Sequence, residues 1–151
     1  MKRYILLVML LLFMAALMAE TGLFDLSYGQ DMADAHTALL AKGFEETKRG
    51  AHFVVYDNDQ IPGLMDLEIR DIFEDGTVSS WTARYYLPYA PGLVGKMLAD
   101  LKAIHQMEPE QIYSNMIWTW EFGYPYELDM RLSVDQLWLV IDYTNLDEQG
   151  Y

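Results

Sequence analysis

Apolar residues recur at helical spacing in two separate stretches of the chain. The first stretch begins after Ser27 and Gln30, which have the spacing of a capping box, and Gly43 suits a left-handed residue just past its end. The pattern therefore predicts a helix that ends near Lys42. Its apolar face consists of Met32, Ala35, His36 and Leu39, with Leu40 as a further candidate.

The second helical stretch follows Pro91, a residue that fits the first turn of a helix. Apolar positions then keep the i, i+3, i+4, i+7 spacing as far as His105, which predicts a longer helix with one face to bury. That face carries Val94, Met97, Leu98, Leu101, Ile104 and His105.

Elsewhere the period changes to two, which is typical of strands with one buried face. Asp75-Gly76 is a strong turn signal between two such segments. Three strands are predicted after each helix. They are His52 to Tyr56, Met65 to Arg70 and Thr77 to Leu87 in the first half, and Met116 to Phe122, Tyr126 to Leu132 and Leu137 to Tyr143 in the second.

Two pentapeptides, 66–70 and 127–131, repeat the order acid, leucine, acid, aliphatic, arginine at an offset of 61 residues. Leu26 and Leu87, Tyr28 and Tyr89, and Leu40 and Leu101 share this offset. The chain is therefore predicted to be an α+β protein of two tandem α-β-β-β units, about 24–86 and 87–145, with antiparallel sheet and both helices on one face. Pro109-Glu110-Gln111 is predicted to start a short extra helix.

With this order of elements and the Tyr28-Gly29-Gln30 sequence before the first helix, the chain after its N-terminal segment resembles the beta-lactamase-inhibitor-protein-like and outer-membrane assembly lipoprotein folds. The resemblance implies a tandem helix-plus-sheet fold that binds other proteins in the envelope or outside the cell and is not an enzyme. The chain differs from both groups because it has no cysteine for a lipid or for disulfides.

The N-terminal segment, 1–19, has two basic residues followed by an apolar run from Ile5 to Ala19, as a secretory signal does. The run is shorter than the roughly 20 residues that span a membrane, so we expect a cleaved signal and no stable membrane insertion afterwards. The remaining residues, 20–151, are expected to form one exported domain, periplasmic or secreted, held together by burial alone.

The chain carries a formal charge of −13, which becomes −15 when Lys2 and Arg3 leave with the signal. Such a field repels phosphate backbones, so nucleic-acid binding is disfavoured. Attractive partners would be cations, basic proteins or neutral ligands, although net negative charge also simply keeps proteins soluble.

The sequence contains no motif for catalysis, a cofactor or a metal, so no catalytic residue and no cofactor are predicted. His36 and His105 fall on apolar helix faces, where a hydrogen-bonded structural histidine is the expected reading, and His52 is expected to be exposed. The alternatives are a small secreted hydrolase using sheet carboxylate pairs, Asp66 with Glu68 or Glu127 with Asp129, and an acidic calcium-binding module.

The calcium alternative rests on 57–60 and Glu68, which imitate the first, third and last ligands of a calcium loop. Ile61 stands where an oxygen ligand belongs and Pro62 replaces the required glycine, so a solvated turn is favoured.

Strand alternation also predicts which residues the sheet turns away from the helices. The helix-facing set is Met65, Leu67, Ile69, Trp118, Trp120, Phe122, Leu128, Met130 and Leu132. The opposite face then gathers arginine, tyrosine and tryptophan, the residues that recognition hot spots favour. The candidate binding residues for a protein or peptide partner are Tyr56, Arg70, Arg84, Tyr86, Arg131 and Trp138. The competing reading is that these are ordinary sheet-surface residues.

Overall fold

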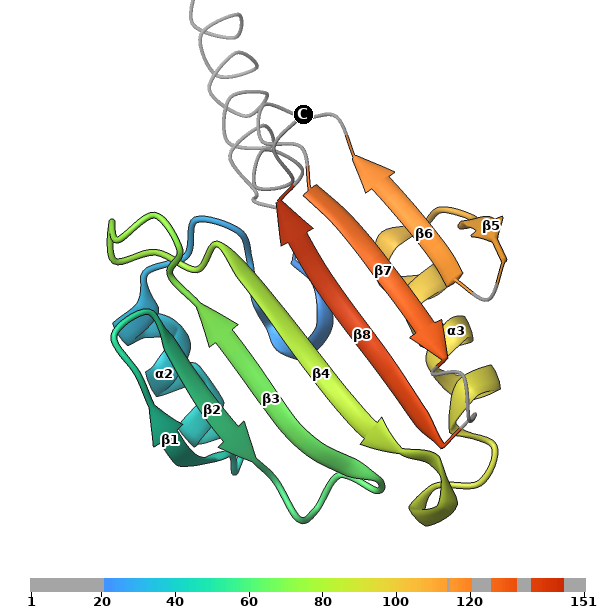
Figure 1. The fold of residues 1–151 in the computed structure, drawn as a ribbon, viewed down its shortest axis with the longest axis horizontal. Helices are drawn as coiled ribbons and strands as arrows, with labels where there is room; N and C mark the ends of the chain where they lie inside the picture. Colours follow the sequence, from blue (N-terminus) through green and yellow to red (C-terminus); the bar gives the residue numbers. More distant parts are fainter. Residues whose placement is uncertain (1–20, 114, 121–125, 133–136, 146–151) are drawn as a thin grey trace, which may run out of the picture.

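A computed structural model of the protein describes residues 21–113, 115–120, 126–132 and 137–145. Within this part of the chain, one mixed α+β unit combines eight strands with two α-helices and two short 3-10 helices (Figure 1). The predicted signal segment, 1–19, lies outside the described residues. No helix in the described part is long and apolar enough to cross a membrane.

The first half of the described chain contains one α-helix followed by four strands. Its elements are η1 (Leu23–Asp25), α2 (Met32–Ala41), β1 (Glu45–Arg49), β2 (Phe53–Asp57), β3 (Leu64–Arg70) and β4 (Ser80–Tyr86).

The second half has the same order, one α-helix and then four strands. Its elements are η2 (Leu87–Tyr89), α3 (Leu93–His105), β5 (Glu110–Ile112), β6 (Asn115–Trp120), β7 (Tyr126–Leu132) and β8 (Trp138–Asn145).

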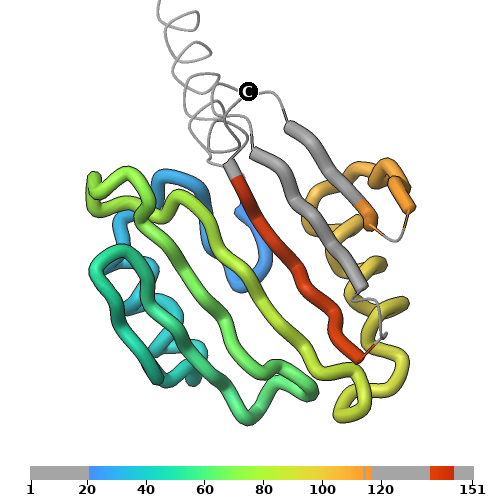
Figure 2. Tube along the Cα trace, viewed as in Figure 1, coloured from blue at the N-terminus to red at the C-terminus, as the bar shows by residue number. Residues whose placement is uncertain are grey.

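All eight strands belong to one antiparallel sheet in the order β1-β2-β3-β4-β8-β7-β6-β5. Each half contributes a four-stranded meander, and the two halves join where β4 pairs with β8. The trace in Figure 2 shows these two strands side by side in the middle of the sheet, although they are far apart in sequence. The two pentapeptides lie on β3 and β7, the third strand of each half.

Both helices pack on the same face of the sheet, α2 behind β1 and β2 and α3 behind β6 and β7, and the segment around η1 lies between them (Figure 1). The predicted α+β class, the antiparallel sheet and the helices on one face are confirmed. The strands turn their alternate side chains into this layer, where Leu67, Ile69, Ala83 and Ile141 are fully buried. From the helices, Leu39 and Leu101 fill the space above them.

Local sequence explains where α2 begins and ends. Asp31 is its N-cap, with Oδ1 accepting from the backbone N–H groups of Ala33 at 2.8 Å and Asp34 at 3.2 Å. The predicted cap, Ser27, instead lies in the preceding turn, where Gln30 accepts from its backbone N–H at 3.1 Å. Gly43 follows the helix with a φ of +84°, as predicted for a left-handed terminating residue.

The structure adds one strand to each half, at the outer edges of the sheet. β1 has the sequence EETKR, with all five residues exposed, and β5 is equally exposed. The residues expected to start an extra helix after Pro109 form β5 instead, so that prediction was wrong. Polar edge strands of this kind protect a sheet from pairing with other chains.

Three further positions differ from the expected pattern. Ile104, predicted on the buried face of α3, is 39% exposed. Met65 is 43% exposed, and Leu64 is buried in its place, because the register between β3 and β4 shifts between Leu64 and Asp66. Leu40 is 45% exposed whereas Leu101 is fully buried. These two leucines, 61 residues apart, therefore lie in different environments. Within the helix-facing set, the side chains of 117–120 and 126–132 and residue 122 lie outside the described part.

Candidate functional site: the open face of the sheet

The candidate site is the sheet face opposite the helices, which we call the open face. In Figure 1 no described helix covers this face. Its centre is formed by β3, β4 and β8, whose registers place matching residues in rows across the sheet. Asp66 pairs with Arg84 and Arg84 with Val140 in one row, and Tyr86 pairs with Trp138 in the next row on the same face.

Four charged side chains on β3 and β4 form a continuous ion-pair network. Arg84 Nη1 donates to Asp66 Oδ1 at 2.5 Å, and its Nη2 donates to Glu68 Oε2 at 3.1 Å. The other oxygen of Glu68 accepts from Arg70 Nε at 2.6 Å. Since Arg84 bridges two strands through two acids, its guanidinium is held in a fixed orientation on the open face.

Partial burial and this network shift the pKa values of its members. Burial outweighs the attraction of Arg84 for Asp66, so the pKa of the Asp66 carboxyl lies above its ordinary value. Burial also acts to raise the pKa of Glu68, but hydrogen bonds from Arg70 and Arg84 outweigh it and the net pKa is lowered. Partial burial opposes the charged form of Arg84, yet Asp66 and Glu68 raise its pKa. Glu68 is therefore the firmly ionised acid of the pair.

An aromatic cluster of Tyr86, Tyr89 and Trp138 adjoins the network at the end of β4 and the start of β8. The rings of Tyr86 and Trp138 lie 5.1 Å apart at 55°, and Tyr89 packs edge-on against Tyr86 at 4.9 Å. Tyr86 and Trp138 are half-buried, while Tyr89 is 69% exposed. Because the rings support one another, they present apolar area in a defined geometry.

Beside the network, the open face carries a polar pair that joins the two central strands, β4 and β8. Thr82 Oγ1 donates to Asp142 Oδ1 at 2.5 Å, and Thr144 Oγ1 lies 3.4 Å from Asp142 Oδ2. Thr82 and Asp142 are register partners on β4 and β8, so this bond joins the two halves of the sheet. This pair could not be predicted from the sequence, because neither threonine nor aspartate is distinctive in a strand.

Of the six residues predicted for binding, Arg70, Arg84, Tyr86 and Trp138 lie on the open face. Arg131 is the register partner of Val140, whose other neighbour is Arg84, so the β7 backbone extends the same row. The side chain of Arg131 lies outside the described part. Tyr89 was missed as a site residue, although its position just after the strand placed it near Tyr86.

The prediction for Tyr56 was wrong, because this residue lies on the helix side of the sheet and not on the open face. It is fully buried, and its hydroxyl lies 2.9 Å from His36 Nδ1 on α2. Desolvation raises the pKa of Tyr56 to about 12. The residue therefore anchors α2 to β2 and is not part of the candidate site.

The three histidines lie where the sequence placed them. His36 pairs with Tyr56, and His105, which is 4% exposed, has Nε2 at 2.7 Å from the Tyr143 hydroxyl on β8. Both histidines thus join a helix to a strand through a tyrosine. His52 is exposed and lies 3.6 Å from the Glu74 carboxylate.

The residues behind the calcium and hydrolase alternatives have other partners in the structure. Asn58 is 5% exposed, and it accepts from the Gln60 N–H and donates to the Lys42 carbonyl, which ties the loop to the end of α2. Glu68 and Asp66 are bound to arginines. No group of three metal-binding side chains is present among the described residues. The side chains of Glu127 and Asp129 lie outside the described part.

Comparison of the chain with protein-family models, with curated proteins and with solved structures gave no match in any of the three.

Proposed function

We propose that the chain is an exported, non-enzymatic binding protein that docks a protein or peptide of the envelope or extracellular space on the open face of its sheet. The observation that carries this proposal is the combination of the Asp66-Arg84-Glu68-Arg70 network with the aromatic cluster on one uncovered face. Arginine, tyrosine and tryptophan dominate recognition hot spots because they combine large contact area with directional hydrogen bonds.

Charge indicates the kind of partner. The chain has a formal charge of −13, and the open face adds Asp66, Glu68 and Asp142 to its two described arginines. A partner segment with net positive charge and at least one apolar or aromatic side chain fits both features. Opposite charge would also speed its association at low ionic strength.

Export is supported by the sequence of the N-terminal segment, two basic residues and then an apolar run to Ala19. The order of elements, one α-helix and then four strands, occurs in both halves and is consistent with duplication of one ancestral unit. The resemblance to envelope binding proteins agrees with a docking role.

Photo-cross-linking tests the open face directly. A photo-reactive amino acid replaces Tyr86, and in a control protein it replaces Phe73, an exposed loop residue that is 48% accessible. We expect a discrete cross-linked partner from position 86 in intact cells, identified by mass spectrometry, and none from position 73. The same partners from both positions would contradict the proposal.

A triple substitution of Arg84, Tyr86 and Trp138 by alanine then measures the contribution of the face to affinity for that purified partner. We expect binding to weaken by at least about 100-fold, as hot-spot losses do. The matched control replaces three exposed apolar residues away from the open face, Leu40, Ile104 and Tyr113, and is expected to bind normally. Equal loss in both variants, or loss in neither, would contradict the open face as the docking surface.

A further inference from the structure

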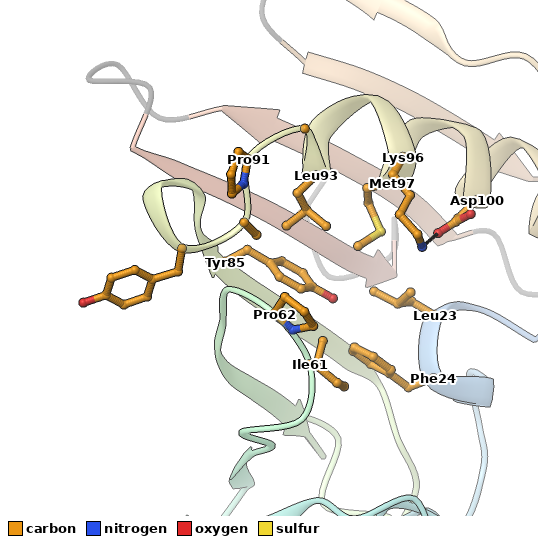
Figure 3. A pocket seen from close by; sticks show the side chains of 13 residues that line it. Leu23, Phe24, Ile61, Pro62, Tyr85, Pro91, Leu93, Lys96, Met97 and Asp100 are labelled. Carbon is orange, nitrogen blue, oxygen red and sulfur yellow. Dashed lines mark hydrogen bonds and ion pairs between the residues drawn. The ribbon is translucent and has the colours of Figure 1, made fainter.

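A pocket of about 490 Å³ lies on the helical side of the molecule, where the start of α3, the loop before β3 and the η1 segment meet (Figure 3). This volume falls within the range of roughly 300–1,000 Å³ that is usual for small-molecule sites. It opens on the other side of the sheet from Arg84 and Tyr86, because its strand residue, Tyr85, points to the opposite side of β4 from them. Tyr89 of the aromatic cluster also lines it.

The pocket walls are almost entirely apolar. The main apolar side chains come from three segments: Leu23 and Phe24 from η1, Ile61 and Pro62 from the loop, and Leu93 and Met97 from α3. The turn 89–92 before α3 completes the wall. Figure 3 shows these six side chains arranged around one common space. Water in such a space finds few hydrogen-bond partners, so its displacement by an apolar molecule is favourable.

One polar atom is aimed into this apolar space. Tyr85 is 1% exposed, and Figure 3 shows its hydroxyl pointing toward the side chains of Leu23, Pro62 and Met97. Among the described residues, no hydrogen-bond partner is found for this hydroxyl. Burial raises the pKa of Tyr85 well above its ordinary value, so the hydroxyl keeps its proton and acts as a donor.

The only charged side chains lining the pocket, within the described part of the chain, are Lys96 and Asp100. They neutralise each other through an ion pair of 2.6 Å (Figure 3). No uncompensated charge therefore faces the pocket, which favours a neutral ligand over an anion or a cation.

We propose that this pocket binds a small, neutral, mostly apolar molecule with one oxygen acceptor, a carbonyl or an ether, that receives the hydrogen bond of the Tyr85 hydroxyl. The six apolar side chains bury the body of the ligand, and Tyr85 fixes its orientation. This proposal does not rest on the proposed docking on the open face, although Tyr89 borders both sites.

The test uses the neutral aromatic ketone dye Prodan, whose carbonyl supplies the acceptor and whose fluorescence moves to shorter wavelength in apolar surroundings. Full-length protein is titrated with the dye, and we expect a saturable blue shift. In Tyr85→Phe, affinity is expected to fall by about 2- to 10-fold, the usual value of one hydrogen bond. Dye that still binds should emit at yet shorter wavelength, because its carbonyl has lost its donor.

Two matched variants locate the binding. Tyr86→Phe removes a hydroxyl from the next residue, which faces the other side of the sheet, and is expected to bind Prodan unchanged. Leu93→Trp fills the pocket and is expected to abolish the saturable part of the blue shift. If that variant does not fold by circular dichroism, Ile61→Trp narrows the pocket from the opposite wall.

Every variant retains residues 1–20, so dye that binds to the apolar N-terminal run contributes equally to all of them. A saturable blue shift that survives the filling variant, or an affinity for Prodan that Tyr85→Phe leaves unchanged, overturns the proposal, as does the absence of saturable binding. Partner capture by the open face is expected to be unaffected by Tyr85→Phe, so failure of one proposal is distinguishable from failure of the other.

Discussion

The hydroxyl of Tyr143 lies 2.7 Å from Nε2 of His105, so the central strand β8 is tied to the last turn of α3. The same hydroxyl accepts from the backbone N–H of Leu23 at 2.9 Å. One buried oxygen thus connects three segments, the η1 region, α3 and β8. The ring of Tyr143 also stacks on Trp81 of β4, with centroids 4.3 Å apart.

Burial lowers the pKa of His105 to about 4, below the value near 6.5 of an unfolded chain. Between these values the unfolded state binds the proton more readily than the folded state. The free energy of unfolding should therefore fall as pH drops from about 6.5 to about 4, and His105 should stabilise fully only above that window. Urea unfolding at several pH values is expected to show this slope, with a smaller slope in His105→Gln.

An NMR titration of the His105 ring provides a direct check. A midpoint near 4 agrees with the burial, and a midpoint near 6.5 would contradict it.

Gly22 has no room for a side chain. A Cβ there would lie 2.5 Å from Tyr143 Cε1 and 2.7 Å from Trp81 Cζ2, and both rings are fixed by their stacking in the core. We expect Gly22→Ala to lower the free energy of unfolding by about 1–3 kcal/mol, as overpacking does. Chemical denaturation measures the loss.

Gly95 is the matched control for this substitution. It lies inside α3, and a Cβ there would meet nothing within 4 Å. We expect Gly95→Ala to stabilise the protein by about 0.5–1 kcal/mol, because alanine favours a helix interior. Equal effects of the two substitutions would contradict the close approach at Gly22.

Replacing Arg84 by alanine removes the partner of two acids at once. We expect the pKa values of Asp66 and Glu68 both to rise, because their ionised forms lose hydrogen bonds and a neighbouring positive charge. The cost in stability should be greater at pH 7, where both acids are ionised, than at pH 3, where protonation relieves it. Arg84 is partly exposed, so at pH 7 we expect only about 1–2 kcal/mol.

The measurement is an NMR titration of the two carboxyl carbons together with denaturation at both pH values. Arg70→Ala serves as the control, because within the described part of the chain Arg70 pairs with Glu68 and not with Asp66, so the titration of Asp66 should stay nearly unchanged. A loss of stability for Arg84→Ala that is larger at pH 3 would contradict the network.

Tyr56→Phe distinguishes a role in the core from a role in the proposed docking on the open face. Loss of the hydroxyl removes the contact with His36, so we expect a decrease of about 1 kcal/mol in the free energy of unfolding. Capture of a partner by the open face should remain normal, because Tyr56 is buried on the helical side. Impaired partner capture by a stably folded Tyr56→Phe protein would contradict the assignment of Tyr56 to the core alone.

The alternation of side-chain types could not decide on which face of the sheet Tyr56 lies. Residues 53–56 are all apolar or aromatic, so a period of two gives no preference for either face. The face is set by pairing, since Val54 lies opposite Ile69 and Tyr56 opposite Leu67, both buried residues of β3. Arg84 and Tyr86 were placed correctly because β4 mixes polar and apolar positions.

The remaining differences have equally local causes. β1 could not be predicted from periodicity because a strand exposed on both faces has no buried side to mark it. Met65 was misplaced because a register shift leaves no signal in the order of side-chain types. The pocket around Tyr85 depends on segments that only the folded chain brings together, so no stretch of sequence could indicate it.

The pairing of β4 with β8 has a consequence for how the chain acquires its structure. The last described strand lies in the middle of the sheet, so the first four strands leave the hydrogen-bonding edge of β4 unpaired until residues 138–145 have emerged from the ribosome. Contacts that bridge such a long sequence separation slow folding and leave an exposed edge prone to association. We therefore expect truncations that remove β8 to aggregate, and the completed chain to close its sheet in a late step.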